Sequence, residues 1–100
     1  MSVSSSVSDD GKKVTINVDG RFDFAVHRQF MFAYKEHPRG EKCFVVDLQD
    51  AEYLDSSALG MLLQLRDHGS KACEVELVNG NEGILEILRI ANFDKLFKVA

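Results

Sequence analysis

The sequence predicts a single α/β domain with a mixed, largely parallel sheet, and three observations support this prediction. Segments with the two-residue period of strands alternate along the chain with segments that have a helical period. Glycine, asparagine and aspartate separate the two kinds of segment. The 100 residues are 45% hydrophobic with one proline, which suits one compact domain over residues 1–100. We expect about four to five strands packed with three to four helices.

Strands are expected at three or four places. Residues 14–18 alternate apolar and polar side chains and give the clearest strand signal. Residues 43–48 form an apolar run, as in a strand covered by helices on both faces, and residues 73–79 alternate again. Residues 3–7 are either a short edge strand or a frayed terminus. The turn at Gly11 would join them to the next strand.

Three helices are expected between these strands. Asp23 is placed to cap a helix that runs to His37, where the only proline stops it. Residues 55–69 form the second helix, closed by a glycine in the C′ position. Residues 80–91 form the third, and residues 93–99 are expected to be a short final helix or strand.

Charge and composition exclude several function classes. The net charge is −4 and the twelve lysines and arginines are scattered, which disfavours a nucleic-acid partner. No apolar run approaches the ~20 residues that span a bilayer, and no polybasic amphipathic helix or secretory segment is present. We therefore expect a soluble, cytoplasmic protein that does not act at a membrane. Cys43 and Cys73 each lead into a β-branched apolar run and are expected to be buried free thiols, not a disulfide.

The candidate catalytic motifs are incomplete. Histidine and cysteine spacings suggest no metal site, and nothing indicates a cofactor. A serine hydrolase would need the glycine elbow that is missing around Ser56 and Ser57. Residues 79–83 follow a strand and open a helix but lack the phosphate-binding residues of a P-loop, so Asn81 is interpreted as a helix cap. The domain is therefore expected not to be an enzyme.

The pair Ser56 and Ser57, preceded by Asp55, has more polar groups than one helix start needs. A single serine can cap a helix and stabilise it by ~1 kcal/mol. A second hydroxyl there would be exposed, and a phosphate on it would carry ~1.5 to 2 negative charges at the positive end of the helix dipole. The fold would tolerate that charge, whereas an anionic partner surface would not. The leucines expected to anchor this helix in the core are Leu59, Leu62 and Leu63.

Three segments resemble one known family. "VDLQDAEYLDSSALGMLL" at residues 46–63 resembles the phosphorylation segment of STAS domains of the anti-sigma-factor antagonist type. "VDGRFDF" at residues 18–24 resembles the family's segment between second strand and first helix, and residues 91–99 resemble its closing segment. The chain looks most similar to the single-domain proteobacterial antagonists of partner-switching systems that regulate surface growth, motility and biofilm. The resemblance implies a STAS-like fold over the whole chain.

The resemblance also implies roles for individual residues. Ser56 matches the serine that family kinases phosphorylate, and Ser57 is the lesser candidate. Asp23 matches an acidic residue that helps to form the partner surface, next to Asp55. Gly60 matches the glycine that lets the start of the helix pack closely.

Two positions depart from the family pattern. Ala58 replaces a glycine and should stiffen the start of the helix, since alanine favours a helix by up to ~1 kcal/mol. Arg21 replaces a glutamate and reverses a charge near the expected partner surface. Arg21 would either change which partner is recognised or act as a counter-ion for a phosphate on Ser56.

The function implied by the resemblance is a phosphorylation-switched interaction module. With Ser56 unphosphorylated, it would bind a serine kinase that acts as an anti-sigma factor, or a response regulator with a related kinase domain. The kinase would release it by phosphorylating Ser56, and a PP2C-type phosphatase would restore it. The alternative is a constitutive STAS subunit of an ABC-type lipid transporter, in which Ser56 acts only as a cap.

Overall fold

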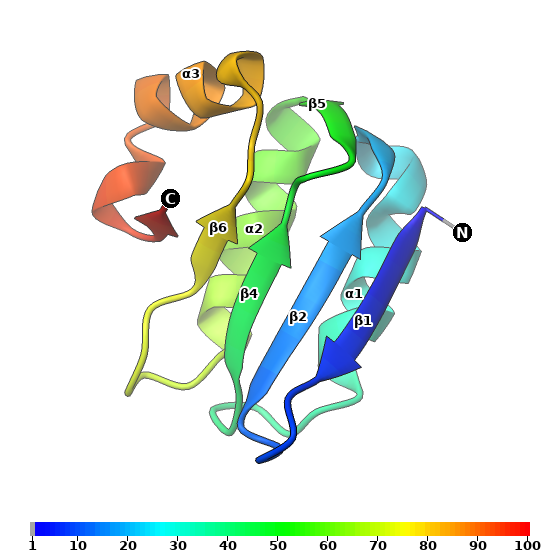
Figure 1. The fold of residues 1–100 in the computed structure, drawn as a ribbon, viewed down its shortest axis with the longest axis vertical. Coiled ribbons are helices and arrows are strands. Elements are labelled where there is room, and N and C mark those ends of the chain that lie inside the picture. Colours follow the sequence, from blue (N-terminus) through cyan, green and yellow to red (C-terminus); the bar gives the residue numbers. More distant parts are fainter. Residues whose placement is uncertain (1) are drawn as a thin grey trace.

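The main sheet of the domain has five strands in the order β1-β2-β4-β6-β7 (Figure 1). The structure is a computed structural model that describes residues 2–100. β1 is antiparallel to β2, and every other neighbouring pair is parallel, so the predicted mixed, largely parallel sheet is confirmed. The strands are β1 (Val3–Val7), β2 (Lys13–Val18), β4 (Cys43–Asp47), β6 (Glu76–Val78) and β7 (Lys98–Val99).

A second, two-stranded sheet was not predicted. It pairs β3 (Gly20–Phe22) with β5 (Ala51–Leu54) in parallel. Each strand is too short to show a period in the sequence, so both segments were expected to be loops. Gly20 has a φ of 81°, a conformation that glycine adopts without strain, and it turns the chain from β2 into β3.

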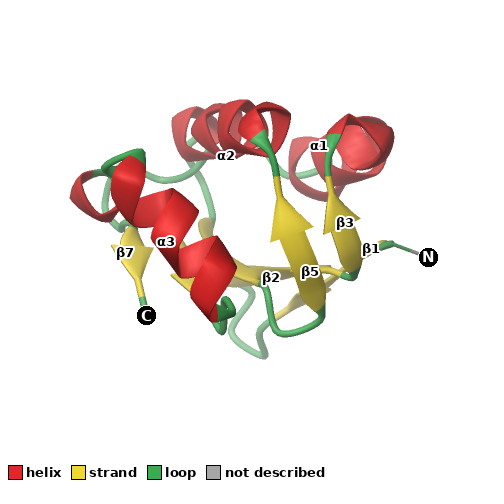
Figure 2. Cartoon of the chain, turned by 90° about the horizontal axis from the view of Figure 1, so that it is seen from above, coloured by secondary structure: helices red, strands yellow, loops and turns green. Residues whose placement is uncertain are grey.

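Two helices lie side by side on one face of the main sheet. These are α1 (His27–Lys35) and α2 (Ser56–His68), while α3 (Glu82–Ile90) lies beyond the end of β6 (Figures 1 and 2). A 3₁₀ helix at Phe24–Val26 precedes α1, and Asp23 caps that turn by accepting the Ala25 N–H at 3.0 Å. Asn81 caps α3, as predicted.

The C-terminal segment contains both of the structures that were expected as alternatives. A 3₁₀ helix at Phe93–Lys95 leads into the short strand β7. In the described part of the chain, no helix combines the length and the apolar character needed to cross a membrane.

The core lies between the main sheet and the α1–α2 layer, and no helix within residues 2–100 covers the opposite face of the sheet (Figure 1). Phe44 and Val46 of β4 are buried, whereas Val45 between them is only half-buried. The prediction of a strand covered on both faces is therefore wrong for β4. The apolar run at residues 43–48 has the composition of a strand with helices on both faces of its sheet. Among the described elements of this fold, helices cover only one face of the main sheet.

The anchors of α2 differ in part from those expected. Leu62 is fully buried and Leu59 is partly buried, but Leu63 is 42% exposed and faces away from the core. The other buried residues of α2 are Ala58, Met61, Leu65 and His68. Leu63 follows Leu62 by one position, about 100° around the helix, so both cannot face the same core.

Gly69 ends α2 as predicted, but for a different physical reason. Its φ of −75° and ψ of 171° are extended and not left-handed, so it does not form the expected C′ motif. A Cβ at this position would lie 3.3 Å from the Phe44 ring. The glycine is needed for space between the end of the helix and β4.

The prediction of two buried free cysteines is wrong. Cys43 and Cys73 are half-buried and form a disulfide with their Cα atoms 5.9 Å apart. β4 and β6 are parallel neighbours with Val45 opposite Glu76, which brings Cys43 at the start of β4 close to Cys73, just before β6. The sequence could not show this proximity because 30 positions separate the two cysteines.

Candidate functional site

The candidate site lies where β3 and β5 end side by side and each leads into a helix. Phe22 of β3 pairs with Leu54 of β5, and the Asp55 N–H donates to the Phe22 carbonyl at 3.4 Å. An aspartate directly follows each strand and caps the helix after it. Asp23 follows β3 and caps the 3₁₀ helix, and Asp55 follows β5 and caps α2. The unpredicted small sheet therefore places two helix N-termini next to each other.

Asp55 is the cap of α2. Its Oδ1 accepts the Ala58 N–H at 3.1 Å and the Ser57 hydroxyl at 2.6 Å. The Ser57 hydroxyl lowers the pKa of the Asp55 carboxyl below 3.8, and the backbone N–H groups of Ala58 and Ser57 lower it further. Asp55 is therefore negatively charged at neutral pH and holds the start of the helix.

The two serines have different environments. Ser57 is half-buried and its hydroxyl donates to Asp55. Ser56 is the first residue of α2 and is exposed, and its hydroxyl has no hydrogen-bond partner within residues 2–100. Because Asp55 supplies the cap, neither serine is required for that purpose, and the Ser56 hydroxyl is the one left accessible.

Ser57→Ala is expected to raise the pKa of Asp55 towards 3.8, because it removes the largest of the interactions that lower that pKa. A lowered pKa means that the charged cap stabilises the fold above about pH 3.8 and that this stabilisation is lost as the pH falls through the folded-state value. The measurement is a carboxyl NMR titration of both proteins. An unchanged Asp55 titration in the Ser57→Ala variant would show that the hydroxyl does not perturb Asp55.

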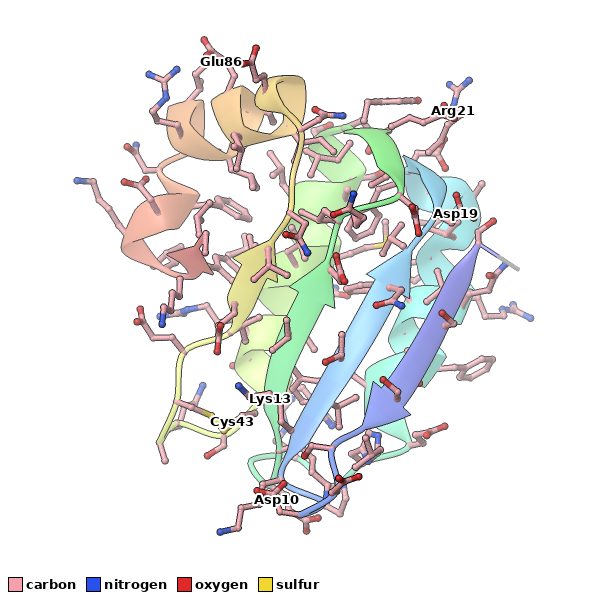
Figure 3. The ribbon with its side chains drawn as sticks, viewed as in Figure 1. Asp10, Lys13, Asp19, Arg21, Cys43 and Glu86 are labelled. Atoms are coloured by element: carbon pink, nitrogen blue, oxygen red, sulfur yellow. A yellow bond between two sulfur atoms is a disulfide. The ribbon has the colours of Figure 1, made fainter. Side chains whose placement is uncertain are left out.

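Arg21 is held across the small sheet by Tyr53. The two residues pair in register, and the Arg21 Nε and Nη2 groups donate to the Tyr53 hydroxyl at 3.1 and 2.7 Å. The guanidinium carbon also lies 5.0 Å from the Tyr53 ring centre, and Nε lies 3.6 Å from Asp23 Oδ2. The bonds to Tyr53 raise the pKa of Arg21, which stays cationic at the end of the domain (Figure 3).

Sequence reasoning missed two residues near this site. Tyr53 lies on the strand that was expected to be a loop, so no periodicity marked it. Phe24 follows Asp23 directly and is 66% exposed, with its ring stacked on His27 at a centroid distance of 4.8 Å. The sequence did contain one signal for Phe24, which is an aromatic residue placed directly after a helix cap. Aromatic side chains are common at protein interfaces.

The role that the resemblance gave Gly60 is not supported within the chain. Gly60 is exposed, and a Cβ there would meet no atom within 4 Å, so the glycine allows no close packing in this domain. Ala58 is fully buried instead. Ser56, Gly60 and Leu63 lie at positions i, i+4 and i+7 and share one exposed face of α2.

Gly60→Ala is expected to stabilise the domain by roughly 0.5 to 1 kcal/mol, because alanine favours a helix interior and the new methyl group meets nothing. Chemical denaturation of both proteins measures the change. If the exposed face of α2 contacts a partner, the same variant should bind that partner more weakly although it is more stable. A destabilised variant would contradict the open environment of Gly60.

The described residues offer no candidate metal centre. Among residues 2–100, no three His, Cys, Asp or Glu side chains are grouped closely enough to hold a metal ion. The arrangement at the ends of β3 and β5 instead presents the exposed Ser56 hydroxyl directly after the charged Asp55.

Comparison with known proteins assigns the chain to one family. A family model described as "Mlab, STAS domain" matches residues 5–99. The chain therefore belongs to the STAS domain family. Over their full lengths, it is 46% identical to a STAS-domain containing protein of Pseudomonas aeruginosa, strain UCBPP-PA14.

Two solved structures share the fold. An anti-sigma factor antagonist from Mycobacterium paratuberculosis superposes with a TM-score of 0.75 at 20% identity, covering 98% of this chain and 85% of that one. The anti-sigma factor antagonist SpoIIAA in its unphosphorylated form superposes with a TM-score of 0.65 at 17% identity, covering 88% of this chain and 82% of that one. At these identities, the likeness establishes the fold alone.

Proposed function

We propose that this chain is a non-enzymatic interaction module whose binding is switched by phosphorylation of Ser56. The observation that carries the proposal is the Ser56 hydroxyl, which is exposed at the first position of α2 and unbonded among the described residues. Ser57 is the lesser candidate because its hydroxyl is engaged by Asp55. A kinase can therefore reach Ser56 without disturbing the cap of the helix.

A phosphate on Ser56 is compatible with the fold. The N-terminus of a helix favours negative charge by ~0.3 to 2 kcal/mol, and the exposed Ser56 side chain has room for three further oxygens. Asp55 is charged next to it, and Asp23 directly follows the neighbouring strand β3. The added charge would therefore reinforce an existing anionic surface, and a partner that presents a negative charge to the neutral serine would be repelled.

Arg21 is the basic side chain that lies beside Asp23, with its Nε 3.6 Å from Asp23 Oδ2. Its guanidinium donates hydrogen bonds to the Tyr53 hydroxyl and lies near Asp23. The positive charge of Arg21 therefore already partly neutralises the Asp23 carboxylate. In the proposed module, Arg21, Asp23, Asp55 and the α2 face around Gly60 form the partner surface. Arg21 would select the partner, because it reverses the charge usual at that position in the family.

The proposed partner is a serine kinase that acts as an anti-sigma factor, or a response regulator that carries a related kinase domain. A PP2C-type phosphatase would return Ser56 to its neutral form, and the cycle would run in the cytoplasm. The fold shared with anti-sigma factor antagonists supports this choice of partner. One of those antagonists, SpoIIAA, is described in an unphosphorylated form, which supports a switch by phosphorylation. The output would be transcription regulation of surface behaviour such as biofilm and motility.

The proposal is tested by isolating the protein from its own cells and locating any phosphoryl group by mass spectrometry. We expect a singly phosphorylated species with the group on Ser56, and we expect Ser56→Ala bait to capture a kinase partner. A protein that is never phosphorylated and that copurifies with the ATPase of a lipid transporter would overturn the proposal in favour of a constitutive transporter subunit. Phosphate found only on Ser57 would move the switch by one residue and contradict the assignment to Ser56.

A further inference from the structure

The outer edge of β1 is a second surface that the proposed switch does not use. β1 is the outermost strand on one side of the main sheet, and within residues 2–100 no strand pairs with its outer edge (Figure 1). Unpaired edges of this kind can pair with another chain unless charges, proline or a bulge prevents it. The β1 sequence VSSSV contains no charge and no proline, and its pairing with β2 is regular.

The register with β2 shows which backbone groups of β1 face outward. The Asp19 N–H donates to the Ser2 carbonyl at 2.7 Å, and the Ser8 N–H donates to the Lys13 carbonyl at 2.8 Å. Hydrogen-bonded and non-bonded pairs alternate along an antiparallel pair, so the even-numbered residues of β1 bond to β2. The residues whose N–H and C=O groups point outward are Val3, Ser5 and Val7.

A groove of about 240 Å³ runs between this edge and α1. Its α1 side is formed by Gln29, Phe32 and Ala33, with Glu36 at the end of the helix. The Phe32 side chain is 60% exposed, and the Gln29 Oε1 atom is shielded from solvent without a hydrogen-bond partner among the described residues. The groove therefore combines an apolar wall and a negative charge.

We propose that this groove binds an extended segment of a partner protein, which adds a strand to the sheet beside β1. The segment pairs its backbone with the outward groups of β1, and every second side chain faces α1. One of these side chains is apolar and packs on Phe32, and a lysine or arginine two positions away lies beside Glu36.

A second copy of this chain does not fit the same edge. α1 lies directly behind β1 (Figure 1) and contacts β1 more extensively than β2. Two copies joined through their β1 edges would place the two β1 strands about 4.8 Å apart, with the two α1 helices against each other on one face of the joined sheet. Packed helices need about 8 to 10 Å between their axes, so the two α1 helices would overlap. A single extended segment avoids this overlap.

The test uses a phage-displayed library of random peptides, each long enough to span β1, selected against the full chain. Enriched peptides are synthesised and their affinities measured by fluorescence anisotropy. Ser5→Pro removes one outward N–H but no hydrogen bond to β2, and Ser5→Ala is its matched control because it keeps that N–H. We expect Ser5→Pro to weaken binding about tenfold and Ser5→Ala to leave it unchanged.

Two further variants keep the test decisive if the proline variant does not fold. Phe32→Ser changes an exposed side chain and is expected to weaken the same peptides, and Glu36→Lys is expected to reduce the preference for a basic residue. The proposal is overturned if no peptide is enriched, or if enriched peptides bind all variants equally. It is also overturned if sedimentation shows a dimer of this chain that Ser5→Pro dissociates. Each result is independent of the state of Ser56.

Discussion

Ser56→Asp is expected to weaken binding to the kinase partner about a hundredfold, while Ser56→Ala keeps the affinity of the unmodified protein. One added charge that faces a like charge at ~6 Å, with an effective dielectric near 20, costs roughly 3 kcal/mol. That energy corresponds to about two powers of ten in the dissociation constant. The helix dipole stabilises the added negative charge by at most ~2 kcal/mol. Because it does so in the free protein and in the complex alike, it does not offset the loss of affinity. Calorimetry of each variant with the purified partner measures the difference.

Ser56→Asn is the matched control for this experiment. Asparagine has nearly the shape of aspartate and no charge, so a loss confined to aspartate assigns the effect to electrostatics. Ser56 is exposed at the first turn of α2, where an acidic residue favours the helix, so the aspartate variant should melt no earlier than the unmodified protein. If Ser56→Asp and Ser56→Ala bind the partner with equal affinity, the proposed switch is refuted, whichever protein the partner is.

Reduction of the Cys43–Cys73 disulfide is expected to lower the free energy of unfolding by roughly 3 to 4 kcal/mol. The bond closes a loop across 30 positions, and a cross-link over a loop of this length restricts the unfolded chain by about that amount. The native fold should survive, because both cysteines are only half-buried and the core lies on the helix-covered face of the sheet. Urea denaturation with and without a reductant measures the loss.

The double variant Cys43→Ser, Cys73→Ser provides the control. Its stability should match that of the reduced protein and should not respond to the reductant. A reductant that leaves the unfolding midpoint of the unmodified protein unchanged would mean that the two thiols are not linked in solution. Disulfides persist mainly in oxidising compartments, so in the proposed cytoplasmic setting the less stable dithiol form would be the resting one.

The position of the disulfide separates it from the proposed switch. Cys43 lies at one end of the main sheet and Arg21 near the opposite end (Figure 3). Reduction is therefore expected to change stability without changing the geometry around Ser56. This separation allows the binding and stability experiments to be interpreted independently.

The sequence by itself determined the alternation of strands and helices and most of their positions. The periodicity at residues 14–18, the caps Asp23 and Asn81, and the stop at the only proline depend on neighbours a few residues away. The edge strand at residues 3–7, left open against a frayed terminus, is a strand in the structure. The family resemblance rested likewise on contiguous segments, and the family model that matches the chain bears it out.

Only the tertiary structure decided which residues meet across long separations. It paired β3 with β5, joined Cys43 to Cys73, placed Arg21 on Tyr53, and left one face of the sheet open. These features depend on strand register and on where helices lie over the sheet. Both are set by the packing of distant segments, which leaves no local pattern in the chain.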